Sequence, residues 1–169
     1  FVVNGLPLGG CPGGDEENLM FWGTPEGTFE RVEAPSESGL GLVYNSRTAV
    51  FSDIDLDGDL DVLVSNINEP PTLLRNDAPK QGDWLQLLLV HPTLSPPVGT
   101  KVLVSAGGVT HRRDIHGTPS YGGTSTRWIH VGLGDVDQVD SIVIRWPDGS
   151  EEQHGPVAVN QRLTFNKVQ

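Results

Sequence analysis

Five aspartates crowd into nine consecutive residues of the chain, at positions Asp53, Asp55, Asp57, Asp59 and Asp61. Carboxylates at the first, third, fifth and ninth positions of such a loop can converge on one centre if the backbone curls around it. Gly58, at the sixth position, permits the sharp turn that this curl requires. The backbone carbonyl at the seventh position, Asp59, would supply a further oxygen ligand.

Oxygen ligands in this number favour Ca²⁺ over zinc or copper, which prefer nitrogen and sulfur. The EF-hand pattern shares this opening but requires a bidentate glutamate at the twelfth position, where Val64 stands. We therefore predict a calcium loop inside a β-hairpin, with Ca²⁺ bound by the side chains of Asp53, Asp55, Asp57 and Asp61 and the carbonyl of Asp59. The alternative is a solvated acidic turn without metal, in which like charges this close would repel strongly.

A catalytic use of the same carboxylates is a weaker interpretation. Ile54, Leu56 and Leu60 interleave the aspartates, as expected where apolar residues anchor a closed structural loop. General acid or base chemistry would also require a partner side chain, and no histidine or lysine is nearby in the sequence. The loop thus predicts a structural role, and we expect the chain not to be an enzyme.

The elements around the loop follow a period-two alternation of apolar and polar residues, which is typical of strands. Gly107-Gly108 predicts a two-residue hairpin turn. Pro147-Asp148-Gly149-Ser150 predicts another turn, because proline fixes φ and glycine accepts positive φ. We expect strands at 49–51, 60–64, 84–90, 101–106, 109–114, 128–131, 141–146, 151–154 and 162–165, and an all-β fold.

Composition narrows the class of partner. The 169 residues include 22 acidic and 11 basic side chains, for a net charge of −11. A protein this acidic repels phosphate backbones, so we expect no nucleic-acid partner. The longest apolar stretch, 84–90, is too short to span a bilayer, so we expect no membrane insertion.

The single cysteine, Cys11, cannot form an internal disulfide, which is neutral on the compartment. Phe1 begins the chain in the middle of a strand-like pattern. We therefore expect a fragment of a larger precursor, secreted to the extracellular space, whose targeting signal lies outside the sequence.

Two resemblances to known families come from these motifs. Thr28-Phe29, the run 49–61 and 73–77 (Leu-Leu-Arg-Asn-Asp) resemble one FG-GAP (VCBS-type) repeat, the calcium-carrying blade of integrin-like propellers. The C-terminal part resembles the ASPIC/UnbV domain, which follows such repeats in cartilage acidic protein and bacterial secreted proteins. Its matching pieces are 84–87, 99–102, 106–108, 120–121, 130–134 and 139–149.

These resemblances imply a domain organisation. Residues 1–78 would form an FG-GAP-like calcium-binding β-unit, with a partial preceding repeat at 1–17. It would be packed on an ASPIC/UnbV-like antiparallel β-sandwich at 79–169. Members of these families are linked to matrix, adhesion and carbohydrate-degrading multidomain proteins, which implies recognition. One departure is Pro119 to Thr124, where the family usually reads Gly-Ser-Tyr-Leu-Ser-Gln.

Aromatic side chains are the candidate ligand-binding residues, since aromatic faces stack on sugars. In the predicted strand 128–131, Ile129 is expected to face the core. Trp128 would then lie on the opposite face, together with His130. Tyr121 lies in the loop before it. Trp84 alternates with the leucines of its strand, so it is expected to be half exposed or to cover the domain junction. Trp146 alternates with Ile142 and Ile144 and is expected in the core.

We therefore expect a noncatalytic extracellular binding module, stabilised by calcium, that binds a polysaccharide or other glycan as part of a larger secreted protein. Two alternatives remain. The first is a structural or adhesive module whose partner is an extracellular protein. The second is an enzyme, suggested only by the enediyne-biosynthesis name attached to the family.

Overall fold

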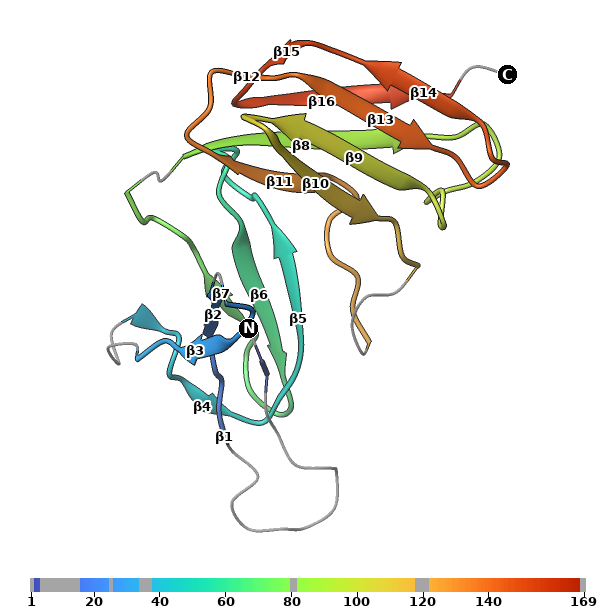
Figure 1. Cartoon of the computed structure of the whole chain (residues 1–169). Helices are drawn as coiled ribbons and strands as arrows, with labels where there is room; N and C mark the ends of the chain where they lie inside the picture. The colour runs from blue at the N-terminus through green and yellow to red at the C-terminus, as the bar shows by residue number, and fades with distance from the viewer. Residues whose placement is uncertain are drawn as a thin grey trace. The chain divides into compact units, whose positions relative to one another are not determined.

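The computed structural model describes residues 2–3, 16–24, 26–33, 38–79, 82–117 and 122–167. Its named elements, β1 to β16, are all strands (Figure 1). The predicted all-β class is thus confirmed. Within these ranges no helix is long and apolar enough to cross a membrane.

The chain divides into two compact units. The first holds Phe1–Ile54, Leu60–Asn76 and Pro119–Ser125, and the second holds Asp55–Asp59, Asp77–Thr118 and Thr126–Gln169. The main division lies between Asn76 and Asp77. Two short segments, the middle of the acidic loop and part of the loop before Trp128, group away from their sequence neighbours, which no sequence pattern indicated.

The first unit is built from short antiparallel sheets. Two of them are two-stranded, and the third has the order β5-β6-β7. The bounds are β1 Glu16–Glu17, β2 Phe21–Gly23, β3 Phe29–Arg31, β4 Val43–Tyr44, β5 Ser46–Ser52, β6 Asp61–Asn66 and β7 Thr72–Leu74. β1 pairs with β4, and β2 with β3. The acidic loop connects β5 to β6, so it is the predicted loop of a β-hairpin.

The interior of the first unit is thin and partly polar. Val64 and Ala49 are buried there, at 1% and 8% exposure. Beside them the Asn18 amide donates to the Ser46 hydroxyl at 3.1 Å, and that hydroxyl donates to Asn66 Oδ1 at 2.8 Å. Because buried polar groups need partners, this chain of hydrogen bonds allows the small sheets to close over polar side chains.

The second unit is a β-sandwich of two main sheets (Figure 1). One sheet has the order β10-β9-β13-β14, the other β11-β8-β16, and β12 pairs with β15. The bounds are β8 Asp83–Val90, β9 Lys101–Ala106, β10 Val109–Asp114, β11 Ile129–Gly134, β12 Gln138–Val139, β13 Ser141–Arg145, β14 Glu151–His154, β15 Val157–Ala158 and β16 Gln161–Asn166.

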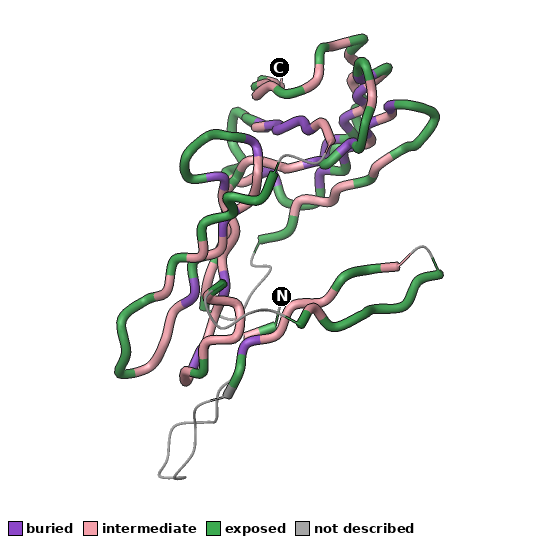
Figure 2. Tube along the Cα trace, turned by 90° about the vertical axis from the view of Figure 1, so that its left-hand side faces the viewer, coloured by how far each residue is buried: buried purple, intermediate pink, exposed green. Residues whose placement is uncertain are grey.

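The core of the sandwich comes from alternate residues of both sheets. Leu85, Leu87 and Leu89 of β8 and Ile142 and Ile144 of β13 are at most 2% exposed. Four buried residues follow one another in β8, whereas buried and half-buried residues alternate in β13; buried stretches of the chain are purple in Figure 2. Burial of this apolar surface is the main stabilising term of the second unit.

Several predicted details of the second unit are confirmed. Gly107 and Gly108 form the tight turn between β9 and β10, both with positive φ (55° and 78°). Trp146 is in the core, at 3% exposure. One detail differs: the sandwich is not wholly antiparallel, because β16 pairs with β8 in parallel. Alternation of side chains is the same in both directions, so the sequence does not encode the direction of that strand.

Candidate metal centre

The hairpin register brings the two ends of the acidic loop together. Ser52 is paired with Asp61 across β5 and β6, so Asp53 and Asp61 leave neighbouring strand ends. Asp55 joins them, and one carboxylate oxygen from each of the three lies within 4.8 Å of the others. Asp53 and Asp61 are buried, at 4% and 2% exposure, while Asp55 is exposed.

Asp61 also holds the surrounding backbone. Its Oδ2 accepts a hydrogen bond from the amide of Ile54 at 2.8 Å, and its Oδ1 accepts one from the amide of Asn76 at 2.9 Å. Asp61 thus ties the start of the loop to the segment after β7, a role that sequence reasoning missed.

Asp57 and Asp59 lie outside this group of three. Asp57 Oδ1 accepts a hydrogen bond from the amide of Asp59 at 2.9 Å, which closes an Asx-type turn at the tip of the loop. Their predicted roles, a carboxylate ligand at Asp57 and a carbonyl ligand at Asp59, stay predictions.

The apolar residues of the loop do not anchor it as expected. Ile54 and Leu56 are 54% and 62% exposed, and Leu56 has a positive φ of 70°. A leucine pays a steric cost in this conformation, because its Cβ approaches the following carbonyl oxygen. The expected apolar anchor is therefore wrong for these two residues, which are exposed, whereas Asp53 and Asp61 are buried.

Gly58 is the contact point of the loop instead. It is buried, after four exposed residues and before the half-buried Asp59, and has a φ of 102°. A Cβ at this position would lie 2.0 Å from Nε1 and 2.2 Å from Cε2 of Trp84, so the indole ring occupies the space of a side chain. Both residues belong to the second unit.

The donors fit a hard divalent cation. All three converging groups are carboxylates, and two of them are buried where uncompensated like charges would be costly. Calcium takes six to eight oxygen ligands in flexible geometry. Asp53, Asp55 and Asp61 would hold such an ion, and the ion would supply charge compensation.

Of the two positions expected for Trp84, half exposed or covering the domain junction, the first is wrong. Trp84 is buried at 9% exposure, so its ring is not accessible to a large ligand. Trp128 precedes β11 and does not take part in its alternation. It is half-buried, with the guanidinium of Arg162 5.1 Å from its ring centre. Tyr121 lies outside the described residues.

His130 does lie beside polar neighbours. In the registers of the β11-β8-β16 sheet, Gln86 is paired with both His130 and Arg162. Arg162 Nε donates to Gln86 Oε1 at 2.9 Å, and Gln86 is 1% exposed. The face that carries Trp128 is therefore polar and held by a cross-strand hydrogen bond.

Another histidine forms a close polar contact that the sequence did not predict. His154 Nε2 lies 3.3 Å from Glu152 Oε2, and Trp146 Nε1 donates to Glu152 Oε1 at 2.9 Å. The His154 ring also packs on Phe165, with ring centres 4.3 Å apart. The Glu152 carboxylate thus contacts both the Trp146 and the His154 rings. We assign these contacts a structural role.

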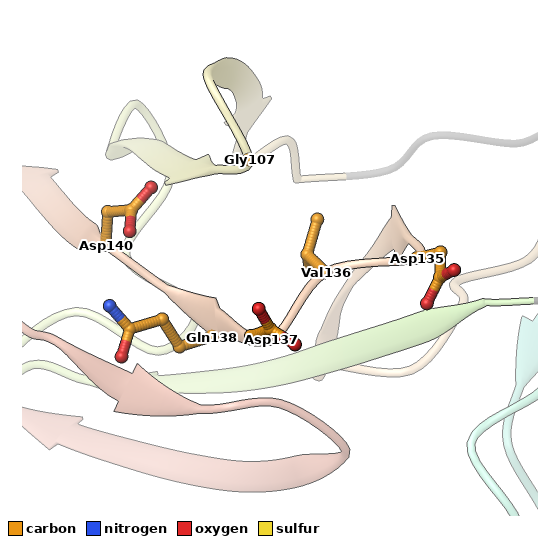
Figure 3. Close-up of a pocket in the computed structure, with 6 residues that line it drawn as sticks. All are labelled: Gly107, Asp135, Val136, Asp137, Gln138 and Asp140. Carbon is orange, nitrogen blue, oxygen red and sulfur yellow. The ribbon is translucent and has the colours of Figure 1, made fainter.

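An open depression of about 500 Å³ lies on the second unit (Figure 3). Gly107 of the β9–β10 turn forms one side. The segment around β12 forms the rest, and its lining includes the exposed carboxylates of Asp135, Asp137 and Asp140. These side chains make the depression acidic.

The chain is an all-β protein that combines a β-sandwich with a hairpin carrying an acidic loop. Residues 93–169 match the model of the family described as ASPIC and UnbV. The resemblance of the C-terminal part is thus confirmed. The matched region leaves out β8, although β8 supplies three leucines to the sandwich core. No curated protein matches the chain.

Proposed function

We propose that this chain is a noncatalytic, calcium-stabilised binding module, and that it recognises carbohydrate as part of a larger secreted protein. The convergence of Asp53, Asp55 and Asp61 carries the calcium part of the proposal. The same residues belong to the stretch that resembles an FG-GAP (VCBS-type) repeat, in which a hairpin loop of this pattern carries calcium.

The electrostatics of the loop support a bound cation. The net charge of the chain is already −11. Two carboxylates that are buried and close to a third gain most from a divalent ion, since charge pairs are screened least where water is excluded. Extracellular calcium modules bind with Kd values of roughly 10⁻⁴ to 10⁻³ M, so such an ion would be bound mainly outside cells. This supports the secreted part of the proposal.

Trp128 is the leading residue of the carbohydrate part. It is half-buried, so it presents part of a rigid ring while Arg162 covers it from one direction. Ordered aromatic side chains lose little conformational freedom on binding, which suits weak and repeated contacts with a polysaccharide. His130, near the same end of β11, would supply a polar neighbour. Because Trp84 is buried, it is left out of this platform.

A specific observation favours a second candidate, a protein-binding adhesive module. Large apolar side chains of the first unit are exposed, Phe29 at 76%, Trp22 at 62% and Leu73 at 52%. Exposed apolar side chains of this size can serve as contact points for another protein. This candidate uses the first unit, whereas the carbohydrate candidate uses Trp128 of the second.

Affinity electrophoresis through gels that contain single polysaccharides tests the proposal, in 5 mM calcium or in EDTA. We expect retardation by at least one polysaccharide, and its loss in Trp128→Ala. Trp22→Ala is the matched control, because Trp22 is an exposed tryptophan of the other unit. Retardation that is lost in Trp22→Ala but kept in Trp128→Ala would place the sugar-binding surface on the first unit, at Trp22. Absence of retardation by neutral, acidic and amino polysaccharides would reject the carbohydrate part.

A further inference from the structure

Gly58 is buried although the four residues before it in the acidic loop are exposed. Residues 54–57 are exposed, Gly58 is buried, and the following Asp59 and Leu60 are half-buried. The covering group is the indole of Trp84, whose Nε1, Cε2 and Cδ1 lie 2.0, 2.2 and 2.6 Å from the position of a Gly58 Cβ. The edge of the ring that carries the N–H therefore faces the glycine directly.

Trp84 is itself held firmly. Its amide donates to Asn160 Oδ1 at 3.2 Å, and its carbonyl accepts from the Asn160 amide at 2.7 Å. Its partner on β11 is Gly132, which has no side chain to displace the ring. A tryptophan fixed in this way can act as a rigid stop for the backbone that packs on it.

The indole N–H is the second observation that points to the loop. Trp84 is only 9% exposed, and its buried Nε1 has no hydrogen-bond partner within the described residues. A buried donor without a partner is costly and is rarely retained unless it has a use. The loop that it faces is the one in which the carboxylates of Asp53, Asp55 and Asp61 converge.

We infer that Trp84 is a positioning residue for the metal loop and sets its affinity for the cation from outside the loop. The inference rests on the proposed calcium site. Gly58 lies between Asp55 and Asp61, so the turn at Gly58 determines whether these two carboxylates meet. Without a stop, repulsion among five aspartates would open the turn, and binding would have to close it again. Preorganisation removes that part of the cost of binding.

Calcium titration calorimetry on the whole chain tests the inference, with Trp84→Phe as the main variant. Phenylalanine keeps an aromatic ring but lacks the edge that reaches Gly58. We expect Trp84→Phe to weaken calcium binding by about tenfold or more through lost preorganisation. Trp146→Phe is the matched control, because Trp146 is also buried and hydrogen-bonded, at 3% exposure, but contacts Glu152. Its calcium affinity should equal that of the wild type.

Terbium supplies an independent readout. Tb³⁺ occupies oxygen sites for calcium and emits when a nearby excited tryptophan transfers energy to it. We expect sensitised emission from the wild type and from Trp146→Phe, and little from Trp84→Phe at saturating Tb³⁺. If Trp84→Phe does not fold, Gly58→Ala tests the same contact from the loop side, since its Cβ would displace the ring. Weaker calcium binding by Gly58→Ala would support the inference.

The outcomes separate the two proposals. Wild-type protein that binds neither Ca²⁺ nor Tb³⁺ would reject the calcium site, and the role of Trp84 with it. Wild-type binding with unchanged affinity in Trp84→Phe, or in Gly58→Ala, would overturn the positioning role alone. A melting curve and a near-ultraviolet circular dichroism spectrum of each variant establish that it is folded before its affinity is compared.

Discussion

Asp61 accepts hydrogen bonds from the amides of Ile54 and Asn76. One buried carboxylate therefore joins two stretches of backbone that are 22 residues apart in the sequence (76 − 54). Asp55 belongs to the same group of three carboxylates but is exposed. These two aspartates therefore differ in their roles. Asp61 is both a candidate ligand and part of the frame, whereas Asp55 is a candidate ligand at the surface.

This difference predicts the behaviour of two variants in EDTA. Asp61→Ala should lower the free energy of unfolding by roughly 2–4 kcal/mol even without metal, because the two backbone amides lose their buried, charged acceptor. Asp55→Ala should change it by less than about 0.5 kcal/mol, as surface substitutions usually do. Urea denaturation in EDTA measures both. Equal losses in the two variants would contradict the framework role of Asp61.

Calcium itself should stabilise the chain by mass action. With a Kd of about 10⁻⁴ M, 10 mM calcium should raise the free energy of unfolding by about 2.7 kcal/mol. Thermal melts at increasing calcium concentrations measure this as a rising Tm, and Asp55→Ala should reduce the rise. A Tm that is the same in EDTA and in 10 mM calcium would reject the site.

Gly58 and Gly99 provide a matched pair for the contact with Trp84. Both have strongly positive φ, 102° and 90°, but an added Cβ at Gly99 meets no atom within 4 Å. Alanine at either position should cost roughly 1–2 kcal/mol for the left-handed backbone. Gly58→Ala should cost a further 1–3 kcal/mol or so, because its Cβ collides with the indole. Urea denaturation measures the free energy of unfolding of both variants. Equal losses would contradict the contact between Gly58 and Trp84.

The sequence was sufficient for the hairpins and for the acidic loop, because both are local. A turn residue such as Gly107, and the spacing of the aspartates between 53 and 61, each determine the structure of a single hairpin. The burial of Trp84 could not be predicted, since alternation along β8 does not say what covers the second face of its sheet. Trp128 was misplaced for a related reason: β11 begins at Ile129, so strand alternation does not govern the preceding residue.

The ion pair between Lys167 and Asp148 predicts a pH dependence. Lys167, and then the hydroxyl and amide of Ser150, donate to Asp148 and hold the pKa of its carboxyl well below the usual range. A carboxyl with a lowered folded-state pKa contributes stability above its unfolded pKa, and this is lost as the pH falls toward the folded value. The Asp148 side chain is more than half exposed, so the contribution is small.

Carboxyl ¹³C titration by NMR measures this directly. In Lys167→Gln the pKa of Asp148 should rise toward its ordinary value while remaining somewhat low, because the bonds from Ser150 are kept. Asp114 is an internal control, since its pKa is lowered by Arg112 and should not change. An Asp148 titration that is identical in the two proteins would show that Lys167 does not contact it in solution.

The contact between Arg162 and Trp128 decides how much of the indole a ligand can use. The guanidinium lies 5.1 Å from the ring centre and also donates to Gln86, which limits its freedom to move away. A cation–π contact at a partly exposed site contributes about 0.5–1 kcal/mol. A double-mutant cycle with Trp128→Ala and Arg162→Gln, measured by urea denaturation, should therefore give a coupling energy of about that size.

A coupling energy near zero would mean that Arg162 leaves the ring in solution, and both faces of Trp128 would then be open to stacking. A coupling of the expected size restricts stacking to the uncovered face, and Arg162→Gln should then strengthen retardation on the same polysaccharide gel.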